Sequence, residues 1–104
     1  MRPDNLPPLD LSGAFLRRTS LSGAILKNAN FAGADFQNAR FVGSDFEGAD
    51  LTGTNLVGAD LTGAKNLTAD QLRRAIIDET TRLPTYIDRT VLTLEEQTDV
   101  SPAE

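Results

Sequence analysis

The sequence predicts an all-β solenoid in which a short extended segment and a corner repeat every five residues. Three observations support this prediction. A large hydrophobic residue recurs at every fifth position from 11 to 61, the residue two before it is small in ten of eleven units, and all eight glycines lie two residues after it. The hydrophobic residues are expected to form a core ladder: Leu11, Leu16, Leu21, Leu26, Phe31, Phe36, Phe41, Phe46, Leu51, Leu56 and Leu61.

A spacing of five residues fits neither regular element. In a straight strand successive side chains alternate between faces, so an odd step would place Phe31 and Phe36 on opposite sides. In an α-helix five residues advance by ~500°, so these side chains would wind around the cylinder. A chain that runs extended, turns a corner and repeats brings all of them to one interior.

Glycine marks the corner, because it adopts a positive φ without a Cβ clash, as the third residue of a type II turn must. Asn28 and Asn38 occupy the equivalent place and belong to the next most tolerant residue type, whereas Arg18 is the exception. The residue just before each hydrophobic residue is mostly Asp or Asn. We expect this side chain to face outward and to accept hydrogen bonds from nearby backbone.

The repeated unit resembles that of the pentapeptide-repeat family. The family consensus A-(D/N)-(L/F)-x-x is carried most clearly by three units: Ala34-Asp35-Phe36, Ala49-Asp50-Leu51 and Ala59-Asp60-Leu61. The resemblance covers residues 9–63 and implies a right-handed quadrilateral parallel β-helix with four pentapeptides, or twenty residues, per coil. These residues would make under three coils, with phenylalanine at the centre of the middle one.

The sequence divides into four regions. They are an N-terminal lead-in and cap (1–8), the β-helix (9–64), a helical C-terminal cap (65–84) and a tail that is partly extended and then acidic and loose (85–104). Caps are expected because each end of a parallel β-helix exposes unpaired backbone groups.

A short capping α-helix is predicted over residues 69–77. Thr68 and Gln71 have the spacing of a capping box, and Leu67 and Leu72 that of a hydrophobic staple. This stretch is similar to the C-terminal cap of many members of the family. Four side chains are expected to cover the last coil: Leu72, Ala75, Ile76 and Leu83.

Residues 86–94 are too apolar for a wholly disordered tail, and residues 90–94 have β character. Two interpretations remain open. The segment either folds back along the coils as an extra strand or loop, or pairs with a partner or a second subunit by strand addition.

Phe15 and Ile25 break the rule that the residue before the ladder position is polar. Each would point a large apolar group outward from the first coil, and the spacing of ten places them on opposite faces. They are either covered by the terminal segments or form a contact surface for a partner, so both are candidate interaction residues.

The net charge of −5 is divided unevenly, because residues 11–40 sum to +3 and residues 41–64 to −4. Acidic members of the family that confer quinolone resistance imitate duplex DNA at type II topoisomerases such as gyrase. The resemblance therefore implies an alternative function as a DNA mimic. The basic first coil and a height below one turn of DNA, ~34 Å, argue against it. The acidic candidates are Asp45, Glu47, Asp50 and Asp60.

Other function classes have little support in the residues. The chain has no histidine or cysteine, so the commonest general base and thiolate chemistry are missing. We predict no catalytic residue, no metal site and no cofactor. Direct nucleic-acid binding is disfavoured because the basic residues are spread over separate faces without stacking aromatics. No apolar leader or membrane-spanning segment is present, so a cytoplasmic location is expected.

These inferences favour a non-enzymatic module whose flat β-helix faces bind another protein of unknown identity. The expected oligomeric state is a monomer or a homodimer. Since the predicted helix would block the C-terminal end, the first coil is the favoured place for self-contact.

Overall fold

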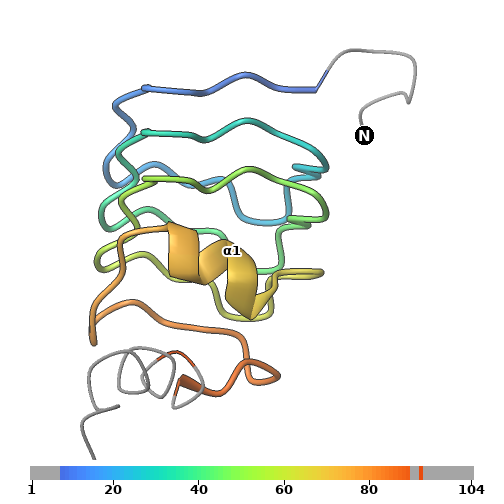
Figure 1. The fold of residues 1–104 in the computed structure, drawn as a ribbon, viewed down its shortest axis with the longest axis vertical. Coiled ribbons are helices and arrows are strands. Elements are labelled where there is room, and N and C mark those ends of the chain that lie inside the picture. The colour runs from blue at the N-terminus through green and yellow to red at the C-terminus, as the bar shows by residue number, and fades with distance from the viewer. Residues whose placement is uncertain (1–7, 90–91, 93–104) are drawn as a thin grey trace, which may run out of the picture.

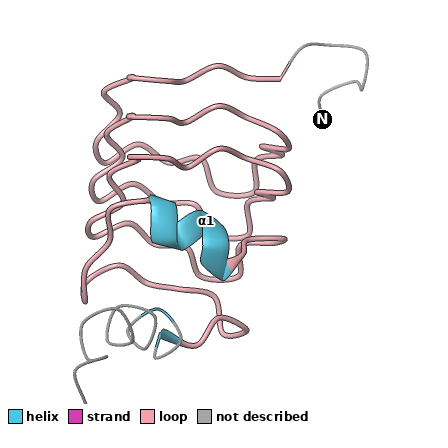
Figure 2. Cartoon of the chain, in the orientation of Figure 1, coloured by secondary structure: helices cyan, strands magenta, loops and turns pink. Residues whose placement is uncertain are grey.

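The computed structural model describes residues 8–89 and 92. The chain winds into stacked four-sided coils around one axis, and the N-terminal coil forms one end of the stack (Figure 1). Figure 2 shows that the coils consist of extended segments and turns, with α1 (Ala69–Arg74) toward the end of the stack away from the N-terminal coil. The architecture confirms the predicted quadrilateral parallel β-helix with a short capping helix.

Neighbouring coils pair in parallel through single-residue bridges twenty residues apart, such as Asp10 with Asn30. Bridged residues point outward, and each column of them defines one face of the β-helix. We name each face by its first residue. They are the Asp10 face (Asp10, Asn30, Asp50), the Phe15 face (Phe15, Asp35, Asn55, Ile76), the Ser20 face (Ser20, Arg40, Asp60, Arg82) and the Ile25 face (Ile25, Asp45, Lys65).

Each corner is a turn closed by a hydrogen bond between the ladder residue and the residue three positions on. The first turn joins the Ala14 amide to the Leu11 carbonyl at 3.0 Å, and the ten that follow measure 2.9–3.4 Å. The third residue of every turn has a positive φ, including the non-glycine residues Arg18 (61°), Asn28 (59°) and Asn38 (61°). The glycine pattern thus marks the corners, as predicted.

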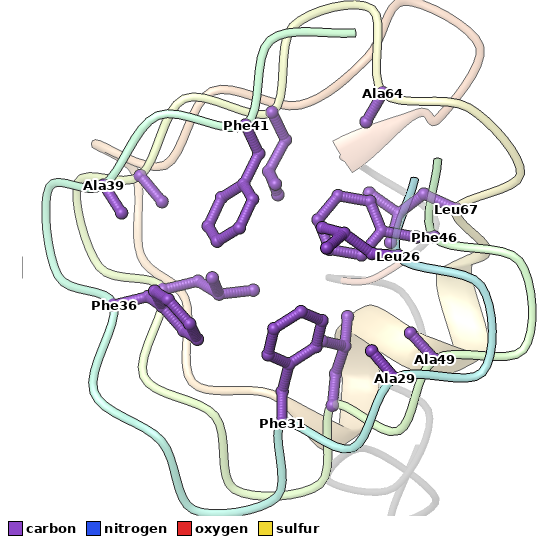
Figure 3. Close-up of a cluster of buried hydrophobic side chains, with 14 of the residues drawn as sticks. Leu26, Ala29, Phe31, Phe36, Ala39, Phe41, Phe46, Ala49, Ala64 and Leu67 are labelled. Atoms are coloured by element: carbon purple, nitrogen blue, oxygen red, sulfur yellow. The ribbon is translucent and has the colours of Figure 1, made fainter. Parts of the chain in front are cut away.

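The ladder side chains fill the interior, and four phenylalanine rings occupy the middle coil (Figure 3). Phe31, Phe36, Phe41 and Phe46 are at most 1% exposed. Adjacent rings along the chain lie 5.1–5.3 Å apart between centroids and meet edge to face. This geometry stabilises each pair by about 0.5–1.5 kcal/mol beyond the burial of its surface.

The first coil is less completely buried than the others. Leu11, Leu16 and Leu21 are half-buried, whereas Leu26 and all later ladder residues are buried. The difference arises because no coil stacks above the first one among the described residues. Eight of the eleven ladder positions are thus buried, and the other three lie at the N-terminal end of the stack.

Inward hydroxyl groups donate to the coil above them. The Thr54 hydroxyl donates to the Phe31 carbonyl at 2.7 Å, and the Ser44 hydroxyl donates to the Leu21 carbonyl at 2.6 Å. Both residues are 0% exposed. Serine and threonine are therefore tolerated at the small inward position, because their hydroxyl groups can donate to a backbone carbonyl of the neighbouring coil.

Helix α1 begins with the predicted capping box at Thr68 and Gln71. The Gln71 side chain also donates to the carbonyls of Phe46 and Ala49, both at 2.9 Å, and so covers backbone acceptors at the end of the stack. The predicted helix over 69–77 is too long. Ala75 is extended (φ −90°, ψ 171°), so the helix ends at Arg74.

The chain resumes the coil directly after α1. Ile76 bridges Asn55, and Arg82 bridges Asp60. Ile76 therefore does not cover the last coil as predicted, because it faces outward and is 50% exposed. Ile77, the next residue, packs against the core instead, and so does Leu83 as predicted. The cap is thus a degenerate fourth coil in which α1 replaces one side.

The segment after Pro84 folds back onto the body where the structure describes it. The Tyr86 hydroxyl donates to the Ala64 carbonyl at 2.5 Å and accepts from the Leu67 amide at 3.1 Å. Ile87 and Leu92 are partly buried against the core. Leu92 is helical rather than extended, in contrast to the expected β character. The expectations for residues 1–7, 90–91 and 93–104 lie outside the described residues.

The corner glycines differ in what a side chain would meet. At Gly48 a Cβ would overlap the Oδ1 atom of Asn28, whereas at Gly53 the nearest atom is the Gly33 amide nitrogen at 3.8 Å. Their φ angles are 69° and 68°. We expect Gly53→Ala to lower the free energy of unfolding by about 1–2 kcal/mol through backbone strain. Gly48→Ala should cost about 1 kcal/mol more, as measured by urea denaturation.

The Asn28→Gly background provides the control for this difference. There the overlap is removed, and Gly48→Ala should cost no more than Gly53→Ala does. An unchanged penalty for Gly48→Ala in both backgrounds would contradict the assigned contact.

Candidate functional site

The Phe15 face carries the largest exposed apolar side chains of the coils. Phe15 is 70% exposed at the N-terminal end of this face, and Ile76 is 50% exposed at its other end. Asp35 and Asn55 lie between them in the same bridged column. Because parallel backbone pairing fixes these positions, the face presents two apolar groups at a set distance along a flat surface.

Several polar groups of the Phe15 face make hydrogen bonds within the face itself. The Arg17 guanidinium lies 4.8 Å from the centre of the Phe15 ring, and its Nε donates to Asp35 at 2.9 Å. Asp35 also accepts from the Gln37 backbone and side chain. The Val57 amide donates to Asn55 at 3.1 Å. A partner that covers the face would leave these hydrogen bonds intact, so desolvation is less costly there.

Ile25 lies on the opposite face, as the spacing predicts, but it is half-buried. Only Phe15 of the two predicted apolar contacts is therefore widely exposed. The sequence pattern could not distinguish them, because both occupy the same position of the repeat.

The four acidic candidates do not form one surface. Asp45 and Glu47 lie on the Ile25 face, Asp50 on the Asp10 face and Asp60 on the Ser20 face. Basic side chains lie close to some of them. The Lys27 Nζ atom lies 3.6 Å from the Glu47 Oε1 atom. In the Ser20 face Asp60 lies between Arg40 and Arg82 in the bridged column, so charge alternates along it.

The acidity of the chain is concentrated outside the coils. Residues 8–89 contain nine Lys or Arg and ten Asp or Glu, a formal net charge of −1. Residues 90–104 contain four acidic residues and no basic one. The coils therefore present nearly balanced charge, and the net −5 of the chain comes mainly from its last fifteen residues.

The outward aspartates accept hydrogen bonds at the corners, which lower their pKa values. The Asn66 side chain and the Glu47 amide lower the pKa of Asp45. The Thr62 hydroxyl lowers the pKa of Asp60, with a smaller effect from the Thr62 amide. A general acid at neutral pH needs a raised pKa, so these carboxylates are suited to structure rather than to proton transfer.

Two kinds of feature are absent from residues 8–89 and 92. No three carboxylate, histidine or cysteine side chains gather in a way that could hold a metal ion. In the same part of the chain, no helix is long and apolar enough to cross a bilayer.

A family model described as pentapeptide repeats matches the chain in eight copies, over residues 9–38 and 29–65. No curated protein is significantly similar to the chain in sequence. Several solved structures are similar to it, among them two with a TM-score above 0.5.

Rfr23, a pentapeptide repeat protein from the cyanobacterium Cyanothece 51142, is 33% identical with a TM-score of 0.59. The match covers 71% of this chain and 53% of Rfr23. QnrB1, a plasmid-mediated fluoroquinolone resistance protein, is 22% identical with a TM-score of 0.62. That match covers 86% of this chain and 40% of QnrB1. The chain thus spans about half the length of these proteins or less, and QnrB1 shows likeness of fold alone.

The sequence pattern did not place Ile76 and Arg17 on the Phe15 face. A signal for Ile76 was present, because Ala75-Ile76-Ile77 repeats the order of a small, an outward and a large inward residue. This signal does not fit the twenty-residue spacing of the coils, because Ile76 bridges a residue 21 positions earlier. Arg17 stands out only once its position over the Phe15 ring is known.

The lowered pKa values predict how stability depends on pH. A carboxyl group whose pKa is lower in the folded state stabilises the fold above its unfolded pKa, about 3.9. This contribution is lost as the pH falls through the folded pKa. We therefore expect the thermal midpoint to be level from pH 7 to 5 and to fall below pH 4.

Asparagine should replace the outward aspartates without loss of the fold, because Asn30 and Asn55 already accept the same turn hydrogen bond. The double variant Asp45→Asn/Asp60→Asn should therefore lose less thermal stability than the wild type between pH 7 and pH 3. Parallel pH profiles of the two proteins would show that these carboxylates are not responsible.

Proposed function

The chain belongs to the pentapeptide-repeat family, whose right-handed quadrilateral β-helix it adopts, and from this premise we propose that it is a non-enzymatic module that binds another protein through the Phe15 face. The observation that carries the proposal is the exposed Phe15 ring, held under the Arg17 guanidinium at the edge of a flat surface. Aromatic residues and arginine are enriched where protein interfaces bind most strongly.

The rigidity of the face supports the same function. Phe15 and Ile76 belong to one column of backbone bridges that also contains Asp35 and Asn55. Little conformational entropy is lost when a partner binds groups that backbone pairing already fixes. The other three outward columns contain charged or polar residues, apart from the half-buried Ile25. The Phe15 face is therefore the one suited to an apolar contact of low charge.

The alternative of a DNA-mimic inhibitor of a type II topoisomerase has weaker support. A mimic needs regularly spaced negative charge on its surface, as phosphates provide on DNA. Here Asp45, Asp50 and Asp60 lie on three different faces, and residues 8–89 carry a net charge of −1. The fold that the chain shares with QnrB1 does not supply that surface.

Binding should depend on Phe15 and only weakly on salt. In affinity capture from the native host, Phe15→Ser should reduce the amount of captured partner protein at least tenfold, which corresponds to about 1.4 kcal/mol. Val42→Ser is the matched control, since it replaces a half-buried apolar side chain adjacent to the Ser20 face. Equal capture by both variants, or loss of the partner after nuclease treatment, would contradict the proposal.

A DNA supercoiling assay with gyrase distinguishes the two functions. We expect the purified protein to leave supercoiling unchanged at micromolar concentration. Inhibition that fades with added salt, and that is abolished by neutralising Asp45, Glu47, Asp50 and Asp60, would instead establish the DNA-mimic function.

A further inference from the structure

Within the part of the chain that the structure describes, the N-terminal end of the β-helix is an open edge. The amides of Asn30, Asp35, Arg40 and Asp45 donate to carbonyls of the first coil at 2.8–2.9 Å, and their own carbonyls accept from first-coil amides at 2.8 Å. The equivalent groups one coil earlier have no partner among residues 8–89. They are the backbone N–H and C=O groups of Asp10, Phe15, Ser20 and Ile25.

Apolar side chains of the first coil lie just inside this edge. Leu11, Leu16 and Leu21 are half-buried there, although the same position is buried in the next coil. Figure 1 shows the first coil, in blue, as the end of the stack opposite α1 and the last coil. The other end is covered by α1 and the segment that packs Ile77 and Leu83 against the core. The open edge is thus confined to one end.

The sequence before this edge lacks the residue types that form the other corners. Leu6 lies five residues before Leu11, so the third residue of the preceding corner would be Pro8. Proline is restricted to φ near −65° and cannot adopt the positive φ that every other corner uses. Pro7 and Pro8 also lack the N–H groups needed to pair with the edge. Pro8 is therefore incompatible with a corner like the other eleven, so a regular preceding coil does not suit this edge.

We propose that the open edge binds the same edge of a second copy of this chain, so that the protein forms a head-to-head homodimer. A twofold axis perpendicular to the β-helix would bring the two edges together with their strands antiparallel. In an antiparallel ladder, facing residues that each offer an N–H and a C=O exchange both hydrogen bonds. Asp10, Phe15, Ser20 and Ile25 each offer both groups, one on each side of the coil.

The contact would also bury the half-exposed side chains of Leu11, Leu16 and Leu21 in both copies. The end of the molecule measures about 26 by 25 Å across, so the two copies together would bury on the order of 1,200 Å². This area lies at the lower end of the range for specific interfaces. The outward side chain of Phe15 points away from the axis, so the dimer leaves the Phe15 face accessible.

The position of the interface can be measured because the chain has no cysteine. Ser12 and Thr52 are exposed, lie in one column and are two coils apart, so spin labels at Ser12→Cys and Thr52→Cys form a matched pair. With about 4.8 Å between coils, a head-to-head dimer places the two Thr52 labels farther apart than the two Ser12 labels, by up to about 19 Å. Double electron–electron resonance measures both distances.

Light scattering provides the first test and should give twice the chain mass at high micromolar concentration. Leu16→Gln should raise the dimer dissociation constant at least tenfold while thermal unfolding remains cooperative. If that variant fails to fold, the label distances still decide. A monomer at all concentrations, or Thr52 labels that lie closer together than Ser12 labels, would overturn the proposal. The second result would mean a tail-to-tail dimer.

Discussion

The corner with a positive φ is the constraint on which the rest of the structure depends. It turns the chain after each ladder residue, and the hydrogen bond across the turn, 2.9–3.4 Å in all eleven, holds it there. Four such corners return the chain to its starting side after twenty residues, which sets the parallel bridges in register. The phenylalanine cluster and the four outer faces both follow from that register, because inward and outward positions recur at fixed steps.

The same regularity explains why function does not show in the repeat itself. Outward aspartates recur because each one accepts a hydrogen bond at its corner, as Asp45, Asp50 and Asp60 do. A residue therefore indicates function only where it differs from the residue type that the repeat requires. Phe15 differs because it places an exposed aromatic ring where the repeat usually has a polar residue. The first coil differs because its outer backbone groups have no partner among the described residues. These two features support separate contacts, one with another protein and one with a second copy.

Much of the fold was predictable from the sequence because the residues of each pentapeptide determine its local conformation and its inward position. Gly48 and Gly58 mark corners, and Phe36 and Leu56 mark the interior, without information from distant residues. The degenerate fourth coil was not predictable in this way, because its bridges at Ile76 and Arg82 lie 21 and 22 residues from their partners. Its path depends on α1, whose length is set by packing on the coils rather than by helix propensity. The difference in exposure between Phe15 and Ile25 likewise depends on tertiary surroundings.

The central claim is that a five-residue corner, repeated four times per coil, builds the structure. Amide hydrogen exchange followed by NMR tests it most directly. In the middle coil the amides of Asn30, Phe31 and Gly33 donate to backbone carbonyls of adjacent coils, whereas the Ala32 amide donates to the Asn30 side chain. The account predicts slow exchange interrupted by a faster amide at every fifth residue, at 32, 37, 42 and 47. The Gly48 amide, which has no backbone acceptor among the described residues, should also exchange fast. Protection with the 3.6-residue period of a helix, or with no period, would contradict it.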